Sequence, residues 1–316
     1  MKRTIGVTFS GINDAHLAKI KAVSAEFNVL CAPRDSEELL NCEIVFGHID
    51  QNILTRANNL KWLHIQFSGV DPYLKSDSGL RDDIILTNSA GAYGIGIAEH
   101  LMAMTLMLMR KMPEYGLLQA EKNWKDLGRI RTLYGSVVTV VGVGDIGANF
   151  AARCKVMGAN VRGVARTAKA TPDWADRMFH VEHLDEAIAD ADVVALCLPQ
   201  TAETSGLFDA RRINLMKHGA IILNVGRGSA IDTSALIDAL NAGHLGGAGL
   251  DVTDPEPLPP NHPLWAAPNT IITPHVSGGD SAALTQDLIV DKFARYLADY
   301  AAGRSFAHVV DRRVGY

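Results

Sequence analysis

The chain has 316 residues, a formal net charge of −5 and 47% hydrophobic residues. Domains usually run to about 100–200 residues, so this length predicts two domains with ample material for a buried core. Asp and Glu (35) outnumber Lys and Arg (30), which argues against a nucleic-acid partner, because such binders carry a basic excess. The 21% charged fraction is that of an ordinary globular chain, not of a disordered one.

The cysteines and the apolar segments indicate the compartment. The 4 cysteines form no C-x-x-C pair, so we expect neither a disulfide framework nor a metal site, and a reducing cytoplasm is the predicted location. Polar residues interrupt the N-terminal apolar run, which disfavours a signal peptide. The most apolar segment, Ile95–Met109, contains Glu99 and His100 and is shorter than the roughly 18 residues of a membrane span. We expect a buried helix there and no membrane partner.

Short β-branched runs alternate with helical patterns along the chain, which predicts parallel strands joined by crossover helices. In the first part we expect strands at Thr4–Phe9, Phe27–Cys31, Glu43–Phe46, Trp62–Gln66 and Ile84–Thr87. A second series is expected at Val137–Val141, Asn160–Ala165, Asp192–Leu198, Ala220–Asn224, Gly247–Val252 and Thr270–Thr273. Helices at Ala98–Met112 and Ala282–Ala301 would carry the chain from the first sheet to the second and back, and Ile146–Val156 is a helix inside the second part.

A glycine motif indicates what the second part binds. Gly142-x-Gly144-x-x-Gly147 follows a valine-rich strand and opens a helix, the context of a dinucleotide-binding turn. The glycines would allow the tight turn, the approach of the pyrophosphate and close helix packing, with Asp145 and Ile146 in the first helical turn. Because this turn comes so late in the chain, an independent domain must precede it. We predict a dinucleotide-binding domain at 98–281 and a substrate-binding domain made of 1–97 and 282–316.

The second strand of this part ends in Ala165, Arg166 and Thr167, with Lys169 close by. An NAD site usually offers an acidic residue to the ribose here, whereas a guanidinium suits a 2′-phosphate because it pairs bidentately with phosphate oxygens. We therefore expect NADP to be preferred, with NAD possible. A solvated loop cation is the alternative reading of Arg166.

Polar side chains follow several later strands, and in such sheets ligands bind beyond the carboxyl ends of strands. Leu198, Pro199 and Thr204 are placed to wall a cofactor site. Arg227 stands between two glycines after a buried strand. The glycines would leave room for a ligand, and the guanidinium could bind a carboxylate. An arginine satisfied by backbone carbonyls in a turn is the alternative interpretation of this segment.

Two further strands end in polar residues, Asp251 with Glu256 in the loop after it, and His275. A carboxylate beside a histidine orients the ring and favours its protonated form, as a general acid requires. Among the 11 histidines, His275 stands out because it lies at a strand's carboxyl end.

These residues carry a specific resemblance. The glycine motif, "NVGRG", "DPEP" and "TPHVSG" in this order resemble the D-isomer-specific 2-hydroxyacid dehydrogenase family, and the likeness covers essentially the whole chain, including "FSGVD" at 67–71 and "TNSAGAYGIGIAEH" at 87–100. In character the chain is similar to the NADP-preferring glyoxylate and hydroxypyruvate reductases. The resemblance implies two doubly wound parallel-sheet α/β domains, a Rossmann cofactor domain inserted into a flavodoxin-like substrate domain, and a homodimer.

The resemblance also implies residue roles. Arg227 would bind the substrate carboxylate and carbonyl, His275 would be the acid/base, and Glu256 would pair with it. Asp251 would lie near the nicotinamide carboxamide. The backbone amides that would help to hold the carboxylate are those of Ser68, Gly69 and Val70. Further cofactor contacts are expected from Val225, Gly226, Ser277 and Gly278. Candidates for the substrate pocket are His48, Ile49, Tyr93 and Trp265.

Two positions depart from the family pattern: Ala165 replaces a common acid, and Gly94 stands where many members carry a hydroxyl near the nicotinamide.

The expected reaction is hydride transfer between NAD(P)H and a small 2-oxoacid or D-2-hydroxyacid. The alternatives are a phosphoglycerate, formate or phosphite dehydrogenase-like enzyme, and a non-enzymatic dinucleotide sensor like the corepressors of this superfamily.

Overall fold

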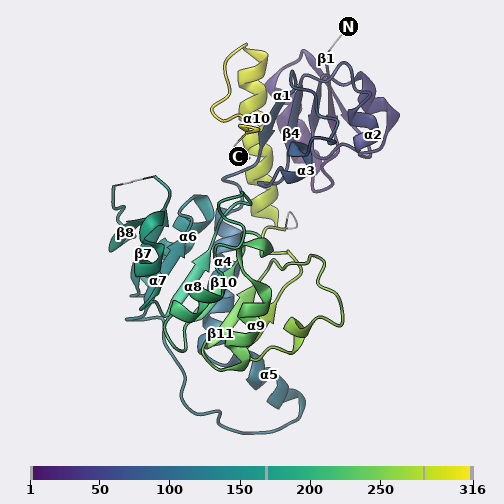
Figure 1. Cartoon of the computed structure of the whole chain (residues 1–316). Helices are drawn as coiled ribbons and strands as arrows, with labels where there is room; N and C mark the ends of the chain where they lie inside the picture. Colours follow the sequence, from purple (N-terminus) through teal and green to yellow (C-terminus); the bar gives the residue numbers. More distant parts are fainter. Residues whose placement is uncertain (1–2, 168–169, 280–281, 314–316) are drawn as a thin grey trace. The chain divides into compact units, whose positions relative to one another are not determined.

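The computed structural model describes residues 3–167, 170–279 and 282–313 (Figure 1). The chain divides into two compact units: unit 1 is Met1–Tyr93 with Gly279–Tyr316, and unit 2 is Gly94–Gly278. Unit 1 therefore combines both ends of the chain, whereas unit 2 is one continuous segment. The divisions lie a few residues before the expected boundaries at 97/98 and 281/282.

Unit 1 is built on a parallel sheet with the strand order β2-β1-β3-β4-β5. Its strands are β1 (Arg3–Val7), β2 (Phe27–Cys31), β3 (Ile44–Phe46), β4 (Trp62–Ile65) and β5 (Ile85–Asn88). Its helices are α1 (Asp14–Val23), the 3₁₀ turn η1 (Glu37–Asn41), α2 (Gln51–Leu54), α3 (Asp71–Leu74) and α10 (Ala283–Ala301). This strand order is that of a flavodoxin-like doubly wound sheet, as expected.

The sheet of unit 1 is buried on both faces, which is why its strands read as continuous apolar runs. Side chains alternate between the faces along each strand. Leu63 and Ile65 of β4 belong to the apolar cluster that includes α2 and α3. Trp62 points to the other face, where its ring centroid lies 5.2 Å from that of Phe293 in α10.

Unit 2 is built on a parallel sheet with the order β12-β11-β10-β9-β6-β7-β8. Its strands are β6 (Val137–Val141), β7 (Asn160–Ala165), β8 (Arg177–His180), β9 (Val193–Leu196), β10 (Ile221–Asn224), β11 (Gly247–Leu250) and β12 (Thr270–Ile272). Its helices are α4 (Gly94–Met109), α5 (Met112–Ala120), α6 (Asp145–Val156), α7 (Leu184–Ile188), α8 (Ala210–Leu215) and α9 (Thr233–Asn241), with the 3₁₀ turns η2 (Val181–His183), η3 (Gly228–Ala230) and η4 (Pro263–Ala266). The strand order reverses beside β6, as in a Rossmann sheet.

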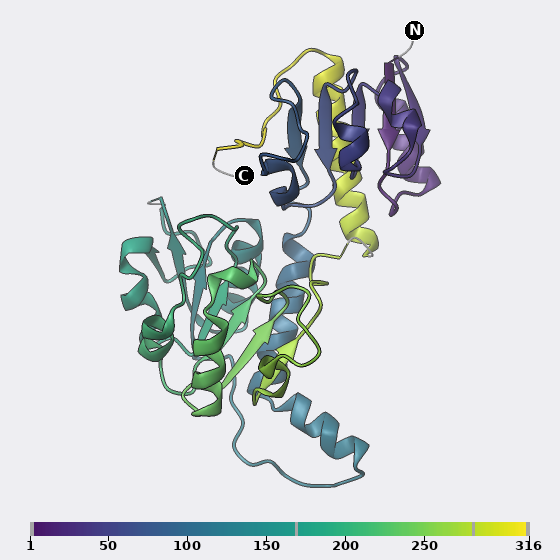
Figure 2. The ribbon, with the colours of Figure 1, turned by 45° about the vertical axis from the view of Figure 1, so that its right-hand side comes forward.

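Two helical layers cover this sheet. Helix α4 packs on α6 and lies against β10, β11 and β12, while α8 contacts both α7 and α9 (Figures 1 and 2). The second layer encloses a continuous core of Val, Ile, Leu, Ala and Phe side chains. The carboxyl ends of all seven strands lie at one edge of the sheet, because every pairing is parallel.

The ends of the expected strands lie within two residues of the observed ones, but two elements differ further from the expectation. Helix α4 begins at Gly94 rather than Ala98, because its buried face outweighs the poor helix propensity of Gly94 and Gly96. It ends at Met109, and Lys111 has a left-handed φ of 56°, so α5 is a separate helix. The short edge strand β8 was not expected, since only Phe179 of its four residues is buried.

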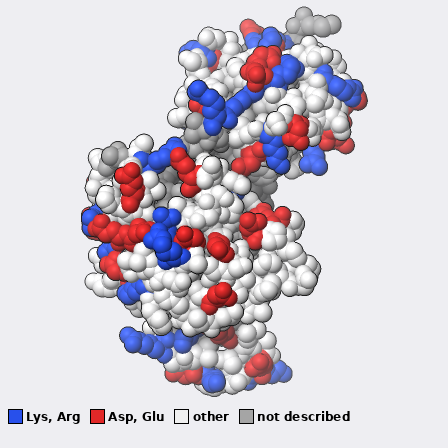
Figure 3. All heavy atoms as spheres, in the orientation of Figure 1, with Lys and Arg blue, Asp and Glu red and all other residues white. Residues whose placement is uncertain are grey.

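The remaining global features concern charge, cysteines and membrane spans. Acidic and basic side chains intermingle on the face drawn in Figure 3. The four cysteines are free thiols. Within residues 3–167, 170–279 and 282–313, no helix is long and apolar enough to cross a membrane, and no cluster of His, Cys, Asp and Glu could hold a metal ion.

Candidate active site and cofactor site

The glycine turn between β6 and α6 combines close backbone packing with open space at the helix end. Gly142 has a φ of 92°, and a Cβ there would lie 2.6 Å from the carbonyl oxygen of Cys197. A Cβ on Gly147 would lie 2.0 Å from the Gly142 carbonyl oxygen, so Gly147 permits the close packing of α6. A Cβ on Gly144 would meet no protein atom within 4 Å, which leaves open space at the N-terminus of α6. These residues therefore fit a pyrophosphate at this helix end.

Asp145 is the first residue of α6, but its carboxylate is directed toward α4. A Cβ on Gly94 would lie 2.4 Å from either Asp145 carboxylate oxygen, so only glycine fits beside it. Asn149 donates a hydrogen bond to Asp145 Oδ1 at 3.2 Å. Gly94, one of the two departures from the family pattern, therefore makes room for Asp145.

At the expected adenosine end, Arg166 and Thr167 follow β7 directly, and Lys169 lies outside the described residues. Arg166 Nη1 lies 3.3 Å from Glu203 Oε2, in the loop after β9. Thr204 in that loop uses its hydroxyl to donate to the Pro199 carbonyl at 2.7 Å. The Thr204 hydroxyl therefore stabilises the conformation of its own loop.

Arg227 follows β10 and is partly buried. On the Cβ side of each flanking glycine the space is filled by protein backbone. A Cβ on Gly226 would lie 2.4 Å from the Leu198 carbonyl oxygen, and one on Gly228 would lie 2.0 Å from the Thr253 carbonyl. The glycines let the backbone pass between two neighbouring loops and so fix the base of the Arg227 side chain.

Asp251 follows β11 and organises the loop after β12. Its buried carboxylate accepts hydrogen bonds from the Thr273 hydroxyl (2.6 Å), the Val276 N–H (2.9 Å) and the Ser277 N–H (3.0 Å), and from the Ser277 hydroxyl. Burial alone would raise the pKa of Asp251, but these bonds outweigh it, and the pKa is lowered. Asp251 thus remains ionised and holds the segment that carries His275.

His275 and Glu256 form a close pair. His275 Nδ1 lies 2.6 Å from Glu256 Oε1, and both side chains are partly exposed. The φ of His275 is 53°, a left-handed conformation that is unfavourable for residues other than glycine. Its N–H donates to the Asp251 carbonyl at 2.8 Å, which helps to hold that conformation. The strands β10, β11 and β12 thus supply Arg227, Asp251 and His275 at the same edge of the sheet.

In unit 1, the segment Ser68–Val70 lies between β4 and α3, again at the carboxyl edge of a parallel sheet. Asn88 donates to the Ser68 carbonyl oxygen at 2.6 Å and fixes the loop. Within the described residues, the N–H groups of Ser68, Gly69 and Val70 donate no hydrogen bond. Three such amides in sequence suit an anion.

Three pocket candidates gather near this loop, while Trp265 belongs to unit 2. His48 Nδ1 lies 2.9 Å from the Tyr73 hydroxyl, which also accepts from the Ile49 N–H at 3.3 Å. The Tyr93 hydroxyl donates to the Gln66 carbonyl at 2.7 Å. Tyr73, which the sequence did not single out, therefore connects His48 and Ile49.

The residues that support Asp251 were not predicted from the sequence. His100 Nε2 lies 3.0 Å from the Thr273 hydroxyl, which itself donates to Asp251. His100 lies in α4, far from Asp251 in the sequence. The one sequence signal for it was its place at the end of the segment "TNSAGAYGIGIAEH", which carries part of the family resemblance.

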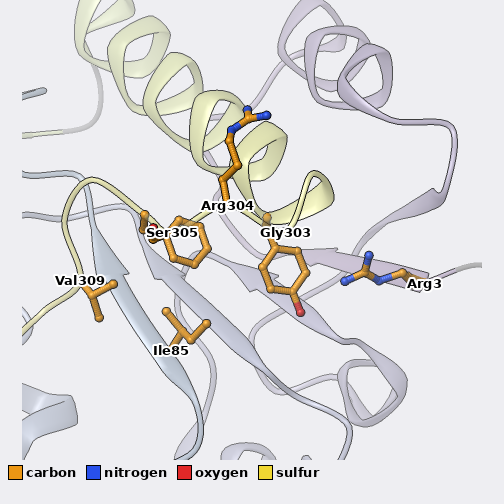
Figure 4. Close-up of a pocket in the computed structure, with 8 residues that line it drawn as sticks. Arg3, Ile85, Gly303, Arg304, Ser305 and Val309 are labelled. Atoms are coloured by element: carbon orange, nitrogen blue, oxygen red, sulfur yellow. The ribbon is translucent and has the colours of Figure 1, made fainter.

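A cavity of about 510 Å³ lies elsewhere in unit 1 (Figure 4). Arg3 and Ile85, the first residues of β1 and β5, line it, so it lies at the amino edge, opposite the Ser68–Val70 loop. Arg3 Nη2 and the Tyr300 hydroxyl both donate to Glu43 Oε1, at 2.6 and 2.7 Å. Burial, with the hydrogen bond to Glu43, raises the pKa of Tyr300 to about 12. Arg3 and Tyr300 in the lining of this cavity thus both pair with Glu43, and Arg304 pairs with Asp299. The cavity is separate from the candidate site.

The two sheets, the glycine turn and the His–Glu pair define a two-domain dehydrogenase of the dinucleotide-binding class. Residues 102–277 match the family model described as "D-isomer specific 2-hydroxyacid dehydrogenase, NAD binding domain". The chain belongs to the D-isomer specific 2-hydroxyacid dehydrogenase family. It is therefore an NAD(P)-dependent oxidoreductase whose cofactor domain is unit 2.

Solved structures support this assignment. A D-isomer specific 2-hydroxyacid dehydrogenase family protein from Aeromonas salmonicida is 32% identical with a TM-score of 0.88, covering 99% of this chain and 100% of that one. The NADPH-dependent glyoxylate/hydroxypyruvate reductase of Sinorhizobium meliloti, solved with NADP and sulfate, is 26% identical with a TM-score of 0.84, covering 100% of both chains.

Curated relatives carry several names. The glyoxylate reductase of Pyrococcus furiosus is 30% identical over 84% of this chain and 80% of its own length. The D-3-phosphoglycerate dehydrogenase of Archaeoglobus fulgidus is 31% identical over 74% of this chain, but the match spans only 44% of that protein.

Proposed function

We propose that the protein reduces a small 2-oxoacid, of the glyoxylate or hydroxypyruvate kind, to the D-2-hydroxyacid with NADPH. The observation that carries the proposal is the 2.6 Å contact between His275 Nδ1 and Glu256, at the sheet edge that also presents Arg227. A formate or phosphite substrate has no C2 carbonyl to protonate, so an acid/base pair favours a 2-oxoacid.

The proposed chemistry assigns one task to each group. When bound, the reduced nicotinamide supplies the hydride for C2 of the 2-oxoacid. With Nδ1–H donated to Glu256, His275 has Nε2 left to protonate the alkoxide oxygen. Arg227 orients the carboxylate and stabilises the charge on the oxygen, and the amides of Ser68, Gly69 and Val70 hold the carboxylate.

The NADP preference rests on Arg166 and on the absence of an acid at Ala165. The glycine turn would hold the pyrophosphate, and Arg166 would pair with the 2′-phosphate. Val225, Gly226, Ser277 and Gly278 would line the nicotinamide half. Asp251 remains a proposed neighbour of the carboxamide, although its carboxylate already accepts hydrogen bonds within the chain.

We further propose a homodimer in a reducing cytoplasm. Large apolar side chains of unit 2 are exposed, which is typical of an interface. They include Met107, Met112, Leu117, Trp124, Ile130, Tyr134, Val156 and Met157, all in the segment from α4 to the C-cap of α6, and we term these eight the apolar surface of unit 2. The free cysteines suit a reducing compartment.

Initial rates with glyoxylate, hydroxypyruvate, pyruvate and bulkier 2-oxoacids, each with NADPH and NADH, test the proposal.

His275→Gln should lower kcat by about 10²- to 10⁴-fold, because it removes the proton donor, and should leave the Kd of NADPH within about twofold. Arg227→Ala should impair both KM and kcat.

His180→Gln is the matched control, since His180 Nδ1 lies 3.4 Å from Glu182 in another exposed pair of unit 2. It should turn over like the wild type. Near-wild-type kcat in His275→Gln would refute the acid/base role. Tight NADPH binding without turnover of any 2-oxoacid would favour the non-enzymatic sensor.

A further inference from the structure

An ion pair links two loops at the carboxyl edge of unit 2. Arg166 follows β7 and Glu203 follows β9, and β6 with its glycine turn lies between these strands. The Nη1 to Oε2 distance is 3.3 Å, with 51% and 71% of the two side chains exposed. The guanidinium proposed for the 2′-phosphate therefore already faces a carboxylate.

The position of Glu203 is set by the turn that carries it. The Thr201 N–H donates to the Thr204 hydroxyl at 2.9 Å, and the Ser205 N–H donates to the Thr201 carbonyl at 3.1 Å. The Gly206 N–H donates to the Ser229 carbonyl at 2.7 Å and anchors the loop to the segment after Arg227. Glu203 lies at the tip of this closed turn, so its backbone cannot withdraw easily when a ligand arrives.

We propose that Glu203 is a specificity-determining residue that limits the preference for NADPH by competing with the 2′-phosphate for Arg166. This inference rests on the proposed role of Arg166. A 2′-phosphate must displace the carboxylate from the guanidinium and then lies near its negative charge. NADH carries a neutral hydroxyl there, so it neither displaces Glu203 nor is repelled by it.

Dissociation constants measured by nucleotide fluorescence test the inference without reference to any substrate. Removing an exposed ion pair changes an equilibrium constant by about 1.4- to 5-fold, so Glu203→Gln should lower the Kd of NADPH by about two- to fivefold and change that of NADH by less than about twofold. Arg166→Gln should raise the Kd of NADPH. When Arg166→Gln is already present, Glu203→Gln should lower the Kd of NADPH by a smaller factor. Added salt should also reduce the effect of Glu203→Gln on this Kd, because it screens the charges.

Glu186→Gln is the matched control. It removes a comparably exposed pair, because Glu186 Oε1 lies 2.9 Å from Arg177 Nη2 at the start of β8, on the amino edge of the sheet. Both constants should stay unchanged. If Arg166→Gln raises the Kd of NADPH but Glu203→Gln leaves it unchanged or raises it, the inference is wrong and the cofactor proposal stands. If Arg166→Gln has no effect, both are wrong. Unaltered thermal midpoints verify that all variants are folded.

Discussion

His64 is a fully buried histidine in the core of unit 1, and its neighbours fix where its proton resides. The Trp62 Nε1–H donates to the Thr87 hydroxyl at 2.8 Å, and that hydroxyl lies 2.7 Å from His64 Nδ1. On the other side, the Ser89 hydroxyl donates to the Ile65 carbonyl at 3.2 Å and lies 3.1 Å from His64 Nε2. Thr87 therefore donates to a bare Nδ1, and Nε2 carries the proton.

If His64 took up a second proton, that proton would lie on Nδ1 and would face the hydroxyl proton of Thr87. Burial, with a contribution from the charge of Lys292, lowers the pKa of His64 from 6.5 to about 3. Above pH 6.5 the ring is neutral in both states. As the pH falls below 6.5 only the unfolded chain gains the proton, so stability is lost progressively toward pH 3.

The free energy of unfolding should therefore fall by about 2 kcal/mol more between pH 7.5 and 5 in the wild type than in His64→Gln, whose amide does not titrate. Urea titrations followed by tryptophan fluorescence measure both. The remaining carboxylates and histidines are common to the two proteins, so the difference isolates His64. Equal falls in the two proteins would show that His64 does not resist protonation.

At the scale of the element, the turn between β6 and α6 contains one glycine that the fold requires and one that we propose lies against the pyrophosphate. Gly147→Ala places a Cβ against the Gly142 carbonyl, and such overpacking costs about 1–3 kcal/mol, visible as a lower Tm. Gly144 has an ordinary φ of −75° and open space around it, so Gly144→Ala should keep the Tm while raising the Kd of NADPH about tenfold or more.

Gly116→Ala in α5 controls for the loss of backbone freedom, since its Cβ would also meet nothing within 4 Å. It should raise the stability by about 0.5–1 kcal/mol and leave nucleotide binding unchanged. Tight NADPH binding by Gly144→Ala would contradict the assigned pyrophosphate site.

The same elements show what the sequence could predict. Buried strands such as β6 and β10 and the turn at Gly142 followed from local patterns, because parallel strands buried on both faces are continuously apolar. The break at Lys111 did not follow, because the apolar pattern of α4 continues through it. The pair of His275 and Glu256 was expected from a resemblance, whereas the Arg166–Glu203 contact was not, because nothing in either segment shows that loops after β7 and β9 meet.

At the scale of the whole molecule, the apolar surface of unit 2 bears on assembly. Val156 and Met157, with Met102, line a cavity of about 490 Å³ between α4 and α6. If a second copy covers this surface, Val156→Asp should halve the mass measured by light scattering, because a carboxylate would be buried without a partner.

Leu215→Asp is the control, since Leu215 is exposed on α8, in the other helical layer. It should leave the mass unchanged. A monomeric wild type, or a Val156→Asp protein of unchanged mass, would remove the argument for this interface.

The composition of unit 1 from two chain segments has a consequence for the order of folding during synthesis. The rings of Phe46 and Trp62 pack on Phe293, with the Phe46 and Phe293 centroids 4.1 Å apart. Phe293 is translated only after every residue of unit 2. The part of the unit 1 sheet that α10 covers therefore stays exposed while the ribosome completes unit 2, so the part of the chain that is made first is the part that is finished last.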